Sequence, residues 1–160
     1  MKTMKTIYIS GPITDPETGR PREGWQKDFL DAEQKLRRMG FNVINPVDIA
    51  REVDEANRWQ YECTSHPCTC NGEPIPPGRA DYIMACLQRM KMCHSLDRLH
   101  GVYVIGPVKA CYASKGVEME LLLAEVLDVP IYAEFQSDRY VDHDFYTIDG
   151  HGTIEELLND

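Results

Sequence analysis

Short apolar runs alternate along this chain with longer segments in which apolar residues recur every three or four positions. The short runs have the β-branched and aromatic content of strands, and the longer segments have the spacing of helices that pack on a sheet. The short runs lie at residues 6–12, 41–47, 100–106 and 129–135. The helical segments lie at residues 25–39, 79–93 and 114–127. This alternation predicts an α/β fold of flavodoxin-like or Rossmann-like type, an open parallel sheet with helices on both faces.

Two segments interrupt the alternation. Residues 48–78 lose the periodicity and contain closely spaced cysteines, and we interpret them as a Cys-rich insertion loop outside the sheet. Residues 136–160 form a polar C-terminal tail in which residues 153–159 predict a short helix. Because a chain of 160 residues suffices for only one domain with a substantial core, we expect a single domain over residues 1–160.

Glu120 breaks the pattern of the third helical segment. At about 100° per residue, Glu118 and Glu125 share a face that can point to water, whereas Glu120 falls between Ala124 and Leu127 on the apolar side. An ionised carboxylate buried without partners costs roughly several kcal/mol, so such a residue is paired, protonated or facing a cavity. Two interpretations follow: an acid that reaches the surface or an arginine, and a functional acid in a pocket.

Net charge and hydropathy argue against some classes of function and some cellular locations. The formal net charge of -9 and a pI near 5.0 argue against binding to a nucleic-acid polymer, since such binding depends on clustered Lys and Arg. The apolar runs are far shorter than the ~20 residues that span a bilayer, and the first residues lack the apolar core of a signal peptide. We therefore expect a cytoplasmic protein without a membrane partner, and binding of a small ligand in a locally basic pocket remains open.

The chain has six cysteines, which we interpret as thiols because nothing in the sequence indicates secretion. Three of them lie with a histidine within eight residues: Cys63, His66, Cys68 and Cys70. Sulfur and nitrogen ligands suit a structural zinc ion, although zinc-binding pairs usually come from two separate segments. A structural zinc site and a flexible loop that bears thiols both remain open.

Ligands of open parallel sheets bind beyond the carboxyl ends of the strands, where the strand order reverses. Residues in the loops that follow the predicted strands are therefore candidates for substrate binding. They are Ser10, Gly11, Asn45, Pro46, Ser114 and Gly116. Ser114 can cap the following helix and Gly116 lets a ligand approach its first turn, where exposed amides favour an anion.

Three stretches carry a resemblance to a known family. They are "IYISGP" (7–12), "AEQKLRRMGFNVINP" (32–46) and "SKGVEMELLLA" (114–124). Together they resemble the nucleoside 2-deoxyribosyltransferase-like superfamily, in particular a phage-associated branch and the 2'-deoxynucleoside 5'-phosphate N-hydrolases. The pattern Ser-x-Gly-x-x-x-Glu, which ends at Glu120, is the most specific part. The resemblance covers about residues 6–47 and 80–132.

The resemblance implies an enzyme that cleaves or transfers N-glycosidic bonds of nucleosides or nucleoside 5'-monophosphates without a metal or other cofactor. It implies Glu120 as the nucleophile that attacks the anomeric carbon of the sugar, and Tyr8 as the residue whose hydroxyl orients it. A tyrosine packed in the core is an equally open interpretation of Tyr8. Ser114 stands where the nucleotide hydrolases contact the 5'-phosphate. Family members form homo-oligomers, so we expect one here.

The chain departs from the family at the acid that protonates the leaving base. The family has two aspartates where this sequence has Cys86 and His94, and a neutral thiol is a poor proton donor. Asp81 lies roughly 140° away from Cys86 around a helix, so we do not expect it to replace the acid. Asp97 is a second candidate, in a segment longer than the family has.

The first loop also departs from the family pattern. The nucleotide hydrolases carry Ser and Arg after the glycine, whereas this chain has Pro12 and Thr14. Arg20 or Arg22 could supply the missing charge from the same loop. The leading hypothesis is thus a nucleotide N-glycosidase or deoxyribosyltransferase. The alternatives are a non-catalytic nucleotide-binding or sensing protein that retains the pocket, and a scaffold for a zinc-stabilised interaction arm.

Overall fold

The sheet has four parallel strands in the order β2-β1-β3-β4. The computed structural model describes residues 3–62, 77–133 and 154–159. Its strands are β1 Thr6–Ser10, β2 Asn42–Ile44, β3 Gly101–Val104 and β4 Ile131–Ala133. The central strand β1 pairs with β2 on one side and with β3 on the other, where Ser10 lies opposite Val104. The predicted strands and the open parallel α/β fold are confirmed.

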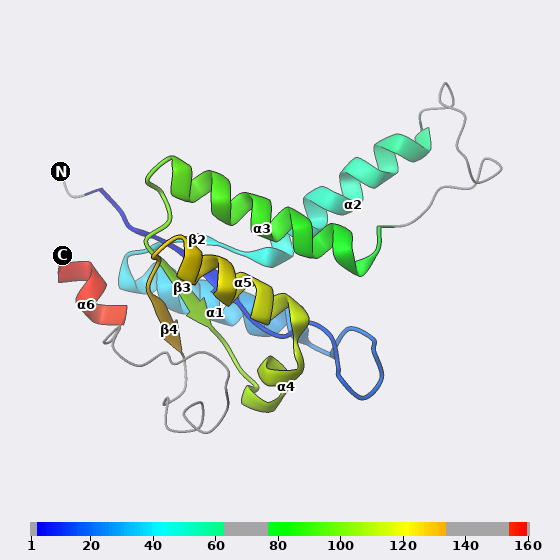
Figure 1. Ribbon diagram of the computed structural model, residues 1–160, viewed down its shortest axis with the longest axis horizontal. Coiled ribbons are helices and arrows are strands. Elements are labelled where there is room, and N and C mark those ends of the chain that lie inside the picture. The colour runs from blue at the N-terminus through cyan, green and yellow to red at the C-terminus, as the bar shows by residue number, and fades with distance from the viewer. Residues whose placement is uncertain (1–2, 63–76, 134–153, 160) are drawn as a thin grey trace.

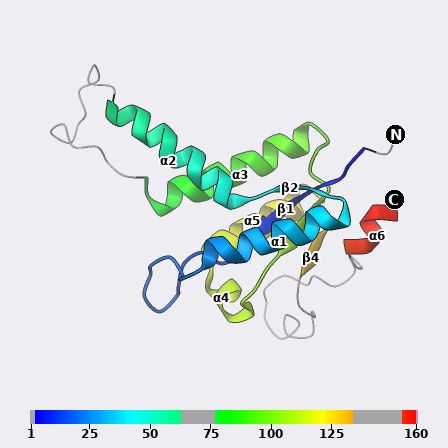
Figure 2. The same cartoon turned by 180° about the vertical axis from the view of Figure 1, so that it is seen from behind.

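Helices cover both faces of the sheet. Within the described residues they are α1 Trp25–Met39, α2 Pro46–Glu62, α3 Arg79–Ser95, α4 Val108–Ala113, α5 Lys115–Val126 and α6 Ile154–Asn159. In Figure 1, α5 lies in front of the sheet and α1 behind it, and the reverse view brings α1 to the front (Figure 2). Helix α3 packs against α5 and also against α2. In this part of the chain, no helix combines the length and the apolar character needed to cross a membrane.

Alternate residues of the central strand belong to two separate cores. Ile7 and Ile9 face the side covered by α1 and α6, whereas Tyr8 faces the side covered by α3 and α5. Successive side chains of a strand point to opposite faces, so Tyr8 faces the side opposite to Ile7 and Ile9. Tyr8 therefore lies on the same side of the sheet as Glu120, which α5 carries.

Helix α2 occupies the first part of the segment 48–78, which the sequence analysis interpreted as an insertion loop. That interpretation is wrong as far as Glu62, where α2 ends. Asn45 caps the helix, because its Oδ1 accepts a hydrogen bond from the Val47 backbone N–H at 2.9 Å, and Pro46 occupies the favourable first helical position. The prediction failed although a signal was present, since Val47, Ala50 and Val53 recur at helical spacing.

The proposed zinc ligands Cys63, His66, Cys68 and Cys70 lie outside the described residues, so the zinc site stays a prediction. Among the residues that the structure does describe, no group of three or more His, Cys, Asp or Glu side chains could hold a metal ion.

The short helix predicted in the C-terminal tail is confirmed as α6. It is amphipathic, because Ile154 and Leu157 are buried in the core on the α1 side of the sheet. The end of the chain therefore contributes to the core, although the sequence analysis treated it as a polar tail.

Gly11, directly after β1, should not tolerate a larger residue. A Cβ atom there would lie 2.5 Å from Ile105 Cγ1 and 3.1 Å from Phe29 Cζ. We expect Gly11→Ala to lower the free energy of unfolding by roughly 1–3 kcal/mol through overpacking, as measured by urea denaturation. Gly116→Ala is the matched control, since it has room on a helix and should raise stability by up to about 1 kcal/mol. Equal stability of the two variants would contradict this packing argument.

Candidate functional site

A cavity of about 360 Å³ opens where β1 and β2 end, and five of the residues singled out in the sequence line it. They are Gly11, Pro46, Ser114, Gly116 and Glu120. The strand order reverses between β1 and β3, so the cavity lies at the place where open parallel sheets bind ligands. Fold and cavity together define an α/β protein with a ligand-sized pocket at the switch point of its sheet.

Glu120 lines the cavity and is nevertheless buried, with 8% of its surface exposed. This confirms the apolar position that the helical spacing predicts. Its Oε2 has no hydrogen-bond partner, and no Lys or Arg pairs with it, among the described residues. Desolvation by burial raises the pKa of Glu120 from 4.5 to about 8, and interaction with Tyr8 opposes the rise only in part. The carboxyl group is therefore largely protonated at pH 7.

Tyr8 and Cys86 flank Glu120 from β1 and α3. Burial raises the pKa of Tyr8 well above its usual range, with Glu120 and Cys86 adding to the rise. Burial and the nearby Glu120 raise the pKa of the Cys86 thiol to about 12. Although Tyr8 interacts with both groups, its hydroxyl makes no well-oriented hydrogen bond within the described residues. All three groups therefore keep their protons at neutral pH, and Cys86 is an unreactive thiol.

The start of α5 provides the second half of the site. Ser114 caps the helix, because its Oγ accepts a hydrogen bond from the Val117 backbone N–H at 3.2 Å. A Cβ atom at Gly116 would lie 3.8 Å from Ser114 Oγ and 3.9 Å from Glu120 Oε1. The capped helix start and the buried acid thus meet within one cavity, and the amides of a helix start favour an anionic group.

One face of α3 forms a wall of the cavity. Arg79, Tyr82, Ile83 and Cys86 follow one another at intervals of three, one and three residues, which places them on one helical face. Ile83 faces α5, since its Cγ1 would lie 3.8 Å from a Cβ atom at Gly116. The face therefore runs from the thiol beside Glu120 to an arginine at the helix start.

Helix α2 forms a neighbouring wall with every fourth residue: Pro46, Ala50 and Asp54. The Tyr82 hydroxyl of α3 donates a hydrogen bond to Asp54 Oδ1 at 2.5 Å. Farther along the two helices, Arg89 of α3 forms an ion pair with Glu52 of α2. The segment interpreted as an excursion from the sheet thus contributes directly to the site.

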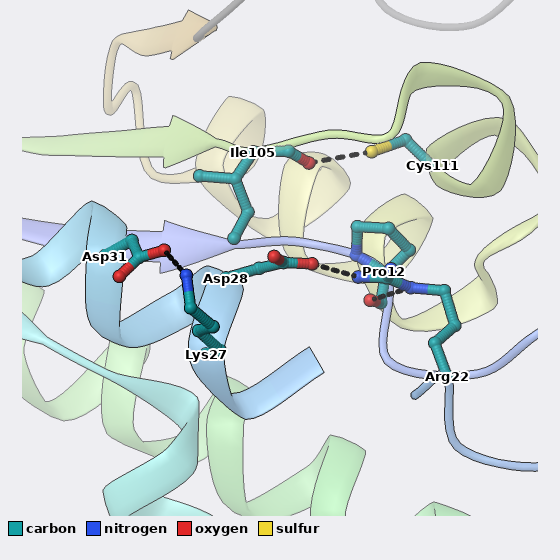
Figure 3. Close-up of polar contacts among 7 residues, drawn as sticks. All are labelled: Pro12, Arg22, Lys27, Asp28, Asp31, Ile105 and Cys111. Atoms are coloured by element: carbon teal, nitrogen blue, oxygen red, sulfur yellow. Dashed lines mark hydrogen bonds and ion pairs between the residues drawn. The ribbon is translucent and has the colours of Figure 1, made fainter. Parts of the chain in front are cut away.

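Neither Arg20 nor Arg22 lines the cavity, although their neighbours Gly19 and Pro21 do. Arg22 Nε donates to the Pro12 carbonyl at 2.9 Å, and its Nη2 pairs with Asp28 at 3.2 Å, so it holds the first loop to α1 (Figure 3). Arg20 is exposed and does not line the cavity. Arg79 does line it and makes no ion pair within the described residues.

Ser10 and Asn45, two other candidates for substrate binding, are absent from the lining of the cavity. Asn45 is buried, and capping α2 occupies its side-chain oxygen, so its role is structural. Ser10 is completely buried at the end of β1, and its hydroxyl has no hydrogen-bond partner among the described residues.

The two aspartates considered as replacements for the family acid also lie elsewhere. Asp81 caps α3, because its Oδ2 accepts a hydrogen bond from the Gly78 backbone N–H at 2.7 Å. Asp97 is exposed after the end of α3, with a φ of 57°. His94 does not line the cavity either. Of the two positions aligned with the family aspartates, only Cys86 lies in the site.

Four polar or aromatic lining residues escaped the sequence analysis: Trp25, Asp54, Arg79 and Tyr82. A signal existed for the last two, since their spacing from Cys86 places them on the same face of α3. Asp54 gave none, because α2 itself was not predicted.

Comparisons of the chain with protein-family models, with curated proteins and with solved structures found no match. Membership of the nucleoside 2-deoxyribosyltransferase-like superfamily therefore remains a prediction that rests on the motifs of the chain.

We expect Glu120 to make the folded state less stable as pH rises, which is the opposite of the usual effect of a paired carboxylate. Its folded pKa of about 8 lies above the ordinary 4.5, so its ionisation destabilises the folded state as pH rises from about 4.5 to 8. We expect Glu120→Gln to raise the free energy of unfolding at pH 9 by roughly 2–5 kcal/mol, with a much smaller difference at pH 5. Urea denaturation at both pH values checks this.

The exposed Glu125 on the same helix is the matched control. Glu125→Gln should change stability by less than about 0.5 kcal/mol at either pH. A Glu120→Gln effect that does not vary with pH would show that the carboxyl group is not buried in this way.

Proposed function

We propose that the protein binds nucleoside 5'-monophosphates in this cavity and cleaves their N-glycosidic bond or transfers the sugar, with Glu120 as the nucleophile. The observation that carries the proposal is the buried Glu120 carboxyl group, which lines a ligand-sized cavity and makes no ion pair with a Lys or Arg of the described residues. Buried acids with a purely structural role are normally paired or hydrogen-bonded, so an unpaired one in a cavity is a candidate for chemistry. The cavity volume of about 360 Å³ lies within the range of small-molecule sites.

The reaction would begin with ionised Glu120. One carboxylate oxygen attacks the anomeric carbon, the C–N bond breaks, and the electron pair passes to the nitrogen of the base. Positive charge develops on the sugar in the transition state, where an unpaired carboxylate in low-dielectric surroundings stabilises it. Water or a second base then attacks the anomeric carbon, the bond from this carbon to the Glu120 oxygen breaks, and the proton that the attacking group loses passes to the released base. Tyr8 flanks the carboxylate and favours its ionised form.

The phosphate group would lie at the start of α5, beside Ser114 and Gly116. Arg79 supports this assignment, because it stands one helical turn before Ile83, which faces Gly116. A guanidinium group can contact two phosphate oxygens at once. Arg79 would therefore supply the charge that the first loop lacks.

A non-catalytic nucleotide-binding or sensing protein is the second candidate function. The observation that favours it is Cys86, whose pKa of about 12 makes it a poor donor of the proton that the leaving base needs. In this case the cavity and its polar groups bind a nucleotide that leaves unchanged.

The remaining features of the proposal come from the resemblance and the composition. A homo-oligomer in the cytoplasm follows the family pattern, and the net charge of -9 supports a small ligand in preference to a nucleic-acid polymer.

Base release tests the proposed reaction. We expect the protein to release free base from at least one deoxynucleoside 5'-monophosphate, as measured by chromatography, and Glu120→Ala to abolish the release. Because the nucleophile must ionise with a pKa of about 8, kcat/KM should rise about tenfold per pH unit below pH 8 and then level off.

The exposed Glu125→Ala variant serves as the control and should keep full activity. Stabilisation by nucleotides that are recovered unchanged would favour the second candidate function. Release that persists in Glu120→Ala would remove Glu120 from the reaction.

Arg79 should distinguish monophosphates from nucleosides. We expect Arg79→Ala to weaken binding of a deoxynucleoside 5'-monophosphate roughly 10- to 100-fold, and to leave binding of the nucleoside nearly unchanged, because one charge-assisted contact is lost. Isothermal titration calorimetry measures both. Arg20→Ala, in the exposed loop, is the control, and an equal loss in the two arginine variants would contradict the role of Arg79.

A further inference from the structure

The Tyr82 and Asp54 side chains form a polar pair on the wall of the cavity where α2 and α3 meet. The Tyr82 hydroxyl donates its proton to Asp54 Oδ1 at 2.5 Å. A phenol has a single proton to donate, so the remaining capacity of the Tyr82 oxygen is to accept. This hydrogen bond also raises the pKa of Tyr82 to about 12, which keeps the proton in place.

Asp54 adds further acceptors to the pair. A carboxylate has two oxygens and about four acceptor positions, of which the Tyr82 hydroxyl occupies one. Asp54 makes no ion pair with any Lys or Arg of the described residues. The pair therefore presents hydrogen-bond acceptors and no donor to a ligand in the cavity.

The position of Tyr82 relative to Glu120 indicates which part of a nucleotide the pair would meet. Tyr82 stands four residues before Cys86, which interacts with Glu120, so the two side chains are separated by one helical turn, ~5.4 Å along the axis. The far edge of a nucleobase lies at a similar distance from the anomeric carbon. With the sugar at Glu120, the edge of the base opposite the glycosidic bond can reach the pair.

The hydrogen-bond donors of Arg79 do not remove the preference of the Tyr82–Asp54 pair for a donor on the ligand. It precedes Tyr82 by three residues, but it lies one turn before Ile83, which faces Gly116 on the α5 side. Tyr82 instead leans toward α2, where Asp54 holds it. The donor and the acceptors of α3 therefore serve two different parts of the ligand.

We propose that the Tyr82–Asp54 pair selects nucleotides whose base carries an amino group on the edge opposite the glycosidic bond, as cytosine and adenine do, over those with a carbonyl there, as uracil and hypoxanthine do. The inference rests on the proposed binding of nucleotides in this cavity. An amino group donates to the acceptors of the pair, whereas a carbonyl oxygen meets them with no hydrogen between.

Paired ligands that differ in this group and in the protonation of the adjacent ring nitrogen test the inference. Dissociation constants for dCMP against dUMP, and for dAMP against dIMP, are measured by calorimetry on the wild-type protein, and each ligand is then recovered by chromatography. Where a ligand is consumed, the ratio of kcat/KM values replaces the ratio of dissociation constants. The comparison is made within the nucleotide pair, dCMP with dUMP or dAMP with dIMP, that binds more tightly. In that pair we expect the nucleotide with the amino group to bind roughly three- to tenfold more tightly, as one hydrogen bond at a partly exposed site allows.

Two variants connect the preference to these residues. Tyr82→Phe removes the acceptor oxygen, and Asp54→Asn replaces acceptors with an amide that can also donate, so each should bring the ratio toward one. The exposed neighbour Glu55→Gln on α2 is the matched control and should keep the ratio. Nucleotide binding with equal or reversed preference in the wild-type protein would overturn the inference alone. Absence of binding by all four nucleotides would overturn the proposed function with it.

Discussion

The burial of the Glu120 carboxyl group beside β1, with no cationic partner among the described residues, is the constraint on which the site depends. Because alternate side chains of β1 point to opposite faces, Tyr8 lies on the same side of the sheet as Glu120. Helix α3 places Cys86 beside the carboxyl group. None of these neighbours carries a positive charge, so the acid retains its proton well above its usual pKa. The apolar core around Glu120 compensates for the unfavourable burial of its carboxyl group. A ligand that interacts with the ionised carboxylate can reduce this energetic cost.

The cavity extends from the buried Glu120 to side chains that are more exposed and more strongly charged. The capped start of α5 suits an anion, Arg79 adds a cation at the start of α3, and the Tyr82–Asp54 pair adds acceptors where α3 meets α2. A nucleotide has an anionic group, a sugar that develops positive charge when its glycosidic bond breaks, and a base with donors and acceptors.

The sequence was sufficient for the parts of the structure that depend on strong periodicity. The four strands, α1, α3 and α5 each bury an apolar face, and the position of Glu120 on the buried face of α5 follows from helical spacing alone. Helix α2 was missed although its first apolar residues recur at helical spacing. Arg79, which lines the cavity, was not predicted, and nothing in the sequence shows that Arg22 is engaged by Asp28 and the Pro12 carbonyl. Contacts between distant segments, such as that of Tyr82 with Asp54, have no local sequence signal.

The titration of the Glu120 carboxyl group itself is the most direct test of this account. The ¹³C chemical shift of its side chain is followed by NMR across the pH range, with and without a deoxynucleoside 5'-monophosphate, and the Glu120→Gln spectrum assigns the signal. The account predicts a midpoint near pH 8 in the protein alone and a displaced midpoint when the nucleotide binds. A midpoint near the ordinary 4.5 that the nucleotide leaves unchanged would contradict it.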